Sequence, residues 1–256
     1  MLKKRFIGVI TVKNGIAVQS IGYERYLPIG NPAIVASNLD RWGVDEIALV
    51  CIDRNVKGLG PDFTTLKNIS RLPLSTPLIY GGGVTNVEQA IKVINFGAER
   101  LTIDGALHAD LTMVEKISYS VGKQALVAAF PLHFSNDRIY WYNYQHKTQK
   151  LLSKHIQNVL RLNLFSEALI IDWKHEGHRN GFDIQLLNTT EFRNTPLIAF
   201  GGLSETQQIR KVLKLRNVVG VGVGNFLNYT EHSVQKYKEC LASEFLRPAY
   251  YDNELF

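Results

Sequence analysis

The 256-residue sequence is poor in cysteine, with only two, and contains no Cys-x-x-Cys pair. A disulfide framework needs several cysteines and a zinc site needs closely spaced ligand pairs, so neither architecture fits this chain. Cys51 falls in an expected strand and Cys240 in an expected helix. Both are typical of free thiols in a reducing compartment, which favours a cytoplasmic protein.

Long hydrophobic runs are lacking too, since none approaches the roughly 20 apolar residues of a membrane-spanning helix. Lys3, Lys4 and Arg5 precede the apolar residues 6–12, an arrangement that superficially resembles a signal peptide. The apolar run stops at Lys13 without a small-residue cleavage site, so we interpret it as the first strand of the fold. We therefore expect no membrane partner.

Dense basic runs are also absent, although the formal net charge is +6 and the isoelectric point is about 9.2. This mild excess fits an anionic small substrate, an acidic partner or ordinary solubility, and gives no argument for nucleic acid. Hydrophobic residues make up 45% of the chain, which is enough for a sizeable core.

What the sequence does contain is a long internal repeat. Residues 77–83 reappear as residues 196–202, and each copy is an apolar strand that runs into glycines. The copies stay in register, because a further glycine follows at the same distance in each, Gly105 in the first and Gly224 in the second. A repeat of roughly 120 residues indicates two fused half-domains rather than a solenoid.

Glycines between a strand and a helix start are typical of phosphate binding, because they let backbone N–H groups approach an anion. Two such corners predict a ligand with two phosphates. The predicted phosphate-binding residues are Gly82, Gly83, Asp104 and Gly105 at the first corner and Gly201, Gly202, Gly224 and Asn225 at the second.

Apolar runs and 3.6-residue periodicity predict eight strands alternating with eight helices. The expected strands lie near 5–11, 45–52, 77–81, 99–104, 124–130, 167–173, 196–200 and 218–223. The expected helices lie near 31–42, 61–71, 86–96, 109–121, 151–164, 183–191, 204–215 and 230–243. This alternation predicts an α/β protein, a single (β/α)₈ TIM barrel over 1–256, with its active site at the C-terminal strand ends.

The repeat divides this barrel into duplicated half-barrels of about 1–122 and 123–243, followed by a tail, 244–256, that we expect to contribute little to the core. We expect long loops over 13–30 and 132–150, at equivalent places in the two halves.

Several short motifs, in their order and spacing, carry a family resemblance that covers nearly the whole chain. They are residues 4–7, 43–46, 80–83, 97–100, 181–183 and 199–202. The sequence resembles the imidazole glycerol phosphate synthase cyclase subunit (HisF) family. The resemblance implies a partner, a HisH-like glutaminase that forms a heterodimer on the N-terminal barrel face. It also implies that ammonia crosses the barrel to a bis-phosphorylated ribonucleotide at the other end, without a cofactor.

The resemblance implies an ammonia gate at the N-terminal mouth, built from alternating charges at strand starts. The matching positions are Arg5, Glu46, Arg100 and Glu167. Two cations and two anions can neutralise one another and pass neutral NH₃. The alternative is that these are ordinary solvated or paired charges at strand ends.

The resemblance also assigns the ligand-binding end. Asp104 stands where the family has asparagine, and a carboxylate repels phosphate, so the second corner is the more suitable phosphate site. Lys13 keeps the position of a family lysine that contacts the ligand; the alternative is a surface charge.

The family's catalytic positions do not match. A general acid and a general base are expected at the ends of the first and fifth barrel strands, and here those positions hold Thr11 and Pro131. A threonine is a poor base near neutral pH and proline offers no acid at all. Glu176, in the loop after the sixth barrel strand, is the replacement candidate for acid–base work.

The same loop places His175 and His178 on either side of Glu176. They could be read as metal ligands, but without a distant third ligand a solvated loop is the better interpretation, and we expect no metal.

Three functions remain open. The first is a synthase subunit of a glutamine amidotransferase complex that delivers ammonia to a phosphorylated or nucleotide-sugar-like acceptor, as in bacterial surface-sugar biosynthesis, where relatives without the aspartates are associated with amidino sugars. The second is the cyclase of histidine biosynthesis, a lyase that makes imidazole glycerol phosphate and an aminoimidazole ribonucleotide. The third is a non-catalytic scaffold that activates a glutaminase. We expect the first.

Overall fold

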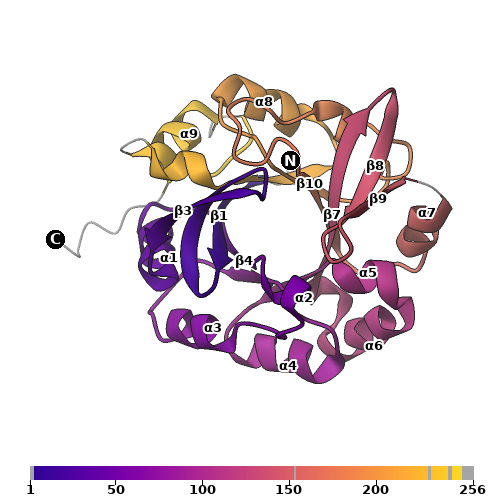
Figure 1. The fold of residues 1–256 in the computed structure, drawn as a ribbon. Helices are drawn as coiled ribbons and strands as arrows, with labels where there is room; N and C mark the ends of the chain where they lie inside the picture. Colours follow the sequence, from indigo (N-terminus) through magenta and orange to yellow (C-terminus); the bar gives the residue numbers. More distant parts are fainter. Residues whose placement is uncertain (1–2, 153, 230–231, 242–243, 250–256) are drawn as a thin grey trace.

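The computed structural model describes residues 3–152, 154–229, 232–241 and 244–249 and shows a parallel barrel with helices around it (Figure 1). Around the barrel, β10 and β7 pair with each other and close the circle of eight parallel strands. In chain order these strands are β1 (Arg5–Lys13), β4 (Glu46–Cys51), β5 (Leu78–Gly81), β6 (Arg100–Ile103), β7 (Leu126–Ser135), β10 (Glu167–Asp172), β11 (Leu197–Phe200) and β12 (Val218–Val223). The predicted (β/α)₈ fold is confirmed.

Helices connect most successive barrel strands and form the outer layer in Figure 1. They are α1 (Pro32–Arg41), α2 (Arg54–Lys57), α3 (Phe63–Ser70), α4 (Val87–Asn95), α5 (Gly105–Ala109), α6 (Leu111–Val121), α7 (Lys154–Arg161), α8 (Thr206–Lys214) and α9 (Ser233–Leu241), with short 3₁₀ turns η1 (Lys123–Ala125), η2 (Ile184–Leu187) and η3 (Asn225–Asn228). Side-chain caps fix several helix starts: Asn31 accepts from the Ala33 N–H, and Asn86 from the Gln89 N–H.

The alternation of each strand divides the core into two layers. In β1, Phe6, Ile10 and Val12 pack outward against the helices, whereas Ile7 and Val9 pack into the barrel interior. Successive side chains of a strand point to opposite faces, so every second residue of a barrel strand is an interior position. This register decides which side chains can meet at either mouth.

The first long loop that we predicted, 13–30, is instead a β-hairpin. β1 runs on to Lys13 and pairs antiparallel with β2 (Ile16–Ile21), which pairs with β3 (Arg25–Gly30). The two turn residues, Asn14 and Gly15, have φ of 51° and 74°. Positive φ at both positions gives a type I′ turn, whose twist suits a hairpin.

The prediction of a second loop over 132–150 is also wrong, because this segment too forms antiparallel strands. β7 extends to Ser135 and pairs with β8 (Arg138–Asn143), which pairs with β9 (Thr148–Leu151). Asn136 and Asp137 have φ of 49° and 56°, again the signature of a type I′ turn. Both halves therefore carry an antiparallel hairpin beyond the C-terminal end of a barrel strand.

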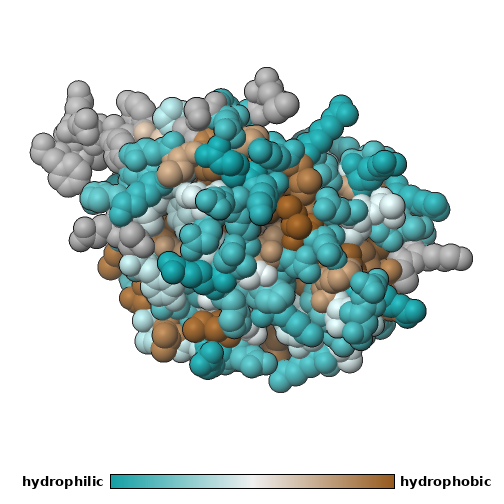
Figure 2. Space-filling model, turned by 90° about the horizontal axis from the view of Figure 1, so that it is seen from above, coloured by the Kyte–Doolittle hydropathy of each residue, from teal (hydrophilic) through white to brown (hydrophobic). Residues whose placement is uncertain are grey.

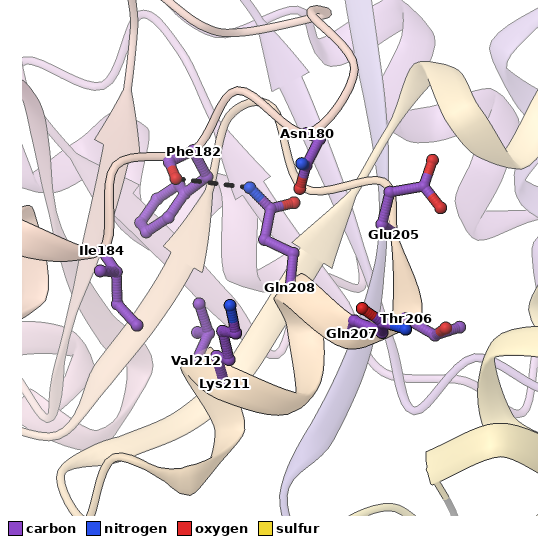
Figure 3. A pocket seen from close by; sticks show the side chains of 9 residues that line it. All are labelled: Asn180, Phe182, Ile184, Glu205, Thr206, Gln207, Gln208, Lys211 and Val212. Carbon is purple, nitrogen blue, oxygen red and sulfur yellow. Dashed lines mark hydrogen bonds between the residues drawn. The ribbon is translucent and has the colours of Figure 1, made fainter.

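The helix predicted over 183–191 is also wrong, since only the turn η2 forms there. Asp183 caps the Gln185 N–H, while the following Asn188, Thr189 and Thr190 are weak helix formers. A surface groove lies between this segment and α8, lined by residues from 180–184 and 205–212, with the Gln208 amide against the Phe182 backbone (Figure 3).

The described part of the tail, 244–249, contributes to the core, contrary to our expectation. Leu246 is fully buried, and the Phe245 carbonyl accepts a hydrogen bond from the Lys4 N–H at 2.9 Å. This segment thus closes over the chain start; the rest of the predicted tail lies outside the described residues.

Hydrophilic residues dominate the face drawn in Figure 2, with smaller hydrophobic areas between them. Within the described ranges, no helix is long and apolar enough to span a membrane.

Candidate functional site

The four predicted gate residues meet at the N-terminal mouth, where β1, β4, β6 and β10 begin. Arg5 contacts Glu46 at 3.2 Å (Nη1–Oε1) and Glu167 at 2.7 Å (Nη2–Oε2). Arg100 contacts the same two carboxylate oxygens at 3.3 and 2.6 Å. Because each cation touches both anions, the four side chains form a closed ring without net charge, which we call the charged ring.

The charged ring is largely withdrawn from water. The Glu46 side chain is 7% exposed, and burial raises its pKa even though Arg5 and Arg100 act to lower it. Burial alone would lower the pKa of Arg5, but Glu46 and Glu167 reverse this and raise it. Arg5 therefore keeps its charge, and each ring member depends on its neighbours.

Beyond the charged ring the barrel interior is apolar. The inner cluster consists of Ile7, Val9, Ala48, Ile79, Val127, Ala129, Leu169, Ile171, Ile198 and Phe200. A narrow cavity lies among these side chains, with Thr102 and Tyr23 also in its wall. The interior thus joins the charged ring to the C-terminal mouth through hydrocarbon surface.

At the C-terminal mouth, Thr11 and Pro131 both hold interior positions. Thr11 follows Ile7 and Val9 on the inner face of β1 and is 6% exposed. Pro131 is likewise buried and shares a face of β7 with Val127 and Ala129 by strand alternation. Neither supplies a carboxyl group.

Lys13 lies at the end of β1, two residues beyond Thr11. Its Nζ sits 3.4 Å from the centroid of the Tyr26 ring, a cation–π contact. The contact ties β1 to β3 across the first hairpin.

Glu176, the predicted acid–base replacement, is buried and already has partners. Its Oε2 accepts a hydrogen bond from Ser20 Oγ at 2.8 Å, and its backbone carbonyl accepts one from the Gly22 N–H at 2.8 Å. Burial raises the pKa of its carboxyl to about 7, against the lowering effect of the Ser20 hydroxyl and of the Tyr23 and Gly22 backbone. Glu176 therefore fastens the first hairpin to the loop after β10.

The second glycine corner forms a small pocket whose wall includes Gly202, Gly224 and Asn225. Gly201 and Gly202 have φ of 106° and 81°, and a Cβ at Gly202 would lie 2.6 Å from the His175 carbonyl oxygen. The Asn225 side chain is engaged elsewhere, since it accepts from the Ser20 N–H and donates to the Ser20 carbonyl. Backbone, rather than the Asn225 amide, remains for an anion.

The first glycine corner differs. Gly82 and Gly83 have φ of 117° and 77°, but the Gly83 N–H already donates to Asn55 Oδ1 at 2.8 Å. Asp104, next to Gly105, is mostly buried, and burial raises the pKa of its carboxyl to about 7. The two corners are thus chemically unequal.

Comparison with known proteins identifies the family to which this barrel belongs. The sequence model of a family described as histidine biosynthesis protein matches residues 5–233. The chain belongs to this family. Similar proteins include the imidazole glycerol phosphate synthase subunit HisF of Staphylococcus saprophyticus, 26% identical over 246 residues that cover 94% of this chain and 97% of the relative. The HisF of Staphylococcus epidermidis is 26% identical over 243 residues, covering 93% and 96%.

This histidine biosynthesis family member is therefore a divergent, HisF-like barrel. The two positions at the C-terminal mouth where the resemblance led us to expect an acid and a base, Thr11 and Pro131, carry no carboxylate.

Sequence reasoning missed His133, the interior position of β7 that follows Pro131. His133 is 2% exposed, and its ring stacks on Tyr140 at 5.1 Å and lies 5.6 Å from Trp173. Burial, with the charges of Lys174 and His175, lowers its pKa to about 4, so the imidazole is neutral near pH 7. Strand alternation beyond Pro131 is the signal that could have found it.

The contact between Asp172 and His175 was also not predicted from the sequence. Asp172, buried at the end of β10, lies 2.8 Å from His175 Nδ1 and accepts from the Asp183 N–H at 2.8 Å. His175 and His178 are both exposed. Across the described residues, no group of three or more His, Cys, Asp or Glu side chains could hold a metal ion.

Proposed function

We propose that this chain is the HisF-like synthase subunit of a glutamine amidotransferase complex. It receives ammonia from a glutaminase on the N-terminal barrel face and delivers it to a phosphorylated acceptor at the C-terminal mouth. The observation that carries this proposal is the charged ring, set at the entrance of an apolar barrel interior.

The charged ring suits a gate for a neutral molecule. The Arg5 and Arg100 contacts with Glu46 and Glu167 close the entrance, and displacing one guanidinium would open it while the other still contacts both carboxylates. Apolar surface beyond the ring disfavours ammonium, because an isolated ion loses its hydration there, whereas neutral NH₃ loses far less.

The chemistry at the far end supports an acceptor other than the ribonucleotide of the cyclase reaction. Positioned acids and bases contribute typically about 10²–10⁴-fold to rate, and Thr11 and Pro131 supply none. Together with the resemblance to relatives without aspartates, this favours a sugar acceptor of surface-polysaccharide biosynthesis.

The cyclase of histidine biosynthesis is the second candidate, favoured by the HisF names of the similar proteins. It would need another acid–base group. Glu176 has a pKa of about 7, suited to that work, but its carboxylate is bound to Ser20.

A cyclase assay separates the two candidates. The purified chain is given the bis-phosphorylated ribonucleotide and saturating ammonium, with the Staphylococcus saprophyticus HisF assayed in parallel. We expect turnover about 10²–10⁴-fold below that of the relative, matching the loss of general acid–base catalysis. Comparable turnover that disappears in Glu176→Gln would establish the cyclase instead.

A further inference from the structure

Asp104 follows β6 and carries unused hydrogen-bonding capacity. Its Oδ1 is buried and has no hydrogen-bond partner among the described residues. His108 Nε2 lies 4.0 Å from this oxygen, beyond hydrogen-bond distance. A buried acceptor that is left unpaired is unfavourable, so this oxygen is suited to a partner from outside the chain.

The two hairpins bring aromatic hydroxyl groups to the same place. The rings of Tyr23, from the β2–β3 turn, and Tyr144, from the β8–β9 turn, are 5.3 Å apart. Burial is the main cause that raises the pKa of each, and the charge of Asp104 adds to it, so both hydroxyls stay protonated. Gln145, which follows Tyr144 in the chain, lies beside Gly105, so the β8–β9 turn reaches the first corner.

The surroundings of Gly105 combine a hydrogen-bond donor with acceptors. A Cβ at Gly105 would lie 3.7 Å from Asn55 Nδ2, an amide donor, and 3.9 Å from Gln145 Oε1, an amide acceptor, so groups of both kinds lie next to Asp104. The Gly83 N–H is already used by Asn55. An ionised Asp104 carboxylate repels a phosphate beside it, and more strongly in a mostly buried site than in water, which disfavours phosphate at this corner.

Among the described residues that line the second corner, no buried side-chain atom is unpaired in this way. Glu176 lines its pocket, but that carboxylate accepts a hydrogen bond from Ser20 Oγ. An acceptor that spans both corners would therefore meet unlike chemistry at its two ends.

We propose that the first corner binds hydroxyl groups of a sugar, with the Asp104 carboxylate as their acceptor, and that the acceptor's phosphate is bound at the second corner alone. This rests on the proposed function, because it describes the acceptor of that same site. A carboxylate accepts from adjacent hydroxyls through two oxygens, and aromatic rings offer apolar faces beside them.

The test counts bound phosphate. Inorganic phosphate is titrated at pH 8 into the full chain, into Asp104→Asn and into Asp104→Ser, with calorimetry reporting the number bound per chain. Asp137→Asn, the same chemical change in an exposed turn, is the control. We expect one more phosphate per chain in both Asp104 variants, and the wild-type number in the control.

A second measurement uses an uncharged sugar, methyl β-D-glucoside, observed by saturation-transfer NMR. Wild type and Asp137→Asn should give a signal that falls at least threefold in both Asp104 variants. Equal numbers of bound phosphates in all four proteins, or a sugar signal that is unchanged in the Asp104 variants, would overturn the inference. If wild type binds no phosphate, the phosphate site at the second corner is contradicted. The difference in bound phosphate between the Asp104 variants and wild type still tests the proposal for the first corner.

Discussion

Two carboxyl groups follow the C-terminal ends of barrel strands: Asp104 is mostly buried and Glu176 is buried, and burial raises the pKa of each to about 7. They differ in their partners. The Glu176 carboxylate accepts a hydrogen bond from the Ser20 hydroxyl, whereas Asp104 Oδ1 accepts from none of the described residues. The charge of Asp104 is therefore the less compensated, and its removal should stabilise the fold.

The expected effect of Asp104→Asn depends on pH. The folded protein holds a proton on Asp104 up to about pH 7, while the unfolded chain loses it near the ordinary value of 3.8. The wild type therefore loses stability as pH rises between about 4 and 7. We expect Asp104→Asn to raise the free energy of unfolding by on the order of 4 kcal/mol at pH 8 and by little at pH 4.

Urea unfolding at both pH values measures this, with Asp137→Asn as the control that should change little at either. The same gain at pH 4 and pH 8 would contradict an origin in the Asp104 charge.

For single residues, the sequence predicted where charged side chains lie better than it predicted which groups they contact. The charged ring could be foreseen from the family resemblance, because Arg5, Glu46, Arg100 and Glu167 match the gate positions that the resemblance implies, and all four begin barrel strands. That Glu176 would be tied to Ser20 could not, since the contact joins residues far apart in the chain.

The first hairpin is an element held in place by side chains from the second half of the barrel. Ser20 bonds through its hydroxyl to Glu176 and through its backbone to Asn225. These contacts fix β2 and β3 over the C-terminal mouth, where Tyr23 lines the interior cavity. Access to the mouth therefore depends on the hairpin's attachment.

Ser20→Ala should loosen this attachment. The Glu176 carboxylate loses its hydroxyl donor, at a cost of about 1 kcal/mol. Amide hydrogen exchange over residues 16–30 should accelerate roughly fivefold, because 1.4 kcal/mol corresponds to tenfold. Mass spectrometry of peptides from this segment gives the rate. Ser120→Ala, which removes an exposed hydroxyl on α6, should leave the segment unchanged; an equal acceleration in both variants would argue against the contact.

The hairpins also show what the sequence prediction of elements missed. Asn14-Gly15 is a strong hairpin signal, and reading 13–30 as a loop ignored it. The second turn, Asn136-Asp137, is weaker, because neither residue is glycine. The short turn η2 was predicted as a helix because apolar residues such as Leu186 and Leu187 are typical of the buried face of a helix. In the structure these two residues are buried within a single 3₁₀ turn.

Across the whole molecule, polar chemistry lies at both mouths and hydrocarbon lies between them. The charged ring stands at the strand starts, the inner cluster fills the barrel, and the hairpins cover the strand ends. The barrel fold could be predicted because eight apolar runs alternate with amphipathic segments. The half-barrel origin stays a prediction, although hairpins at equivalent strands agree with it.

The most direct test of ammonia passage follows nitrogen from its source. The chain, in complex with a HisH-like glutaminase, is incubated with the small-molecule pool of a cell extract and either amide-¹⁵N glutamine or ¹⁵N ammonium. Mass spectrometry then measures ¹⁵N in phosphorylated metabolites. The variant is Arg5→Ala, and Arg25→Ala, which removes an exposed arginine of the first hairpin, is the control. We expect Arg5→Ala to lose at least tenfold of the glutamine-derived label and keep the ammonium-derived label, with Arg25→Ala like wild type. Equal loss from both sources, or no loss from either, would contradict passage through the charged ring.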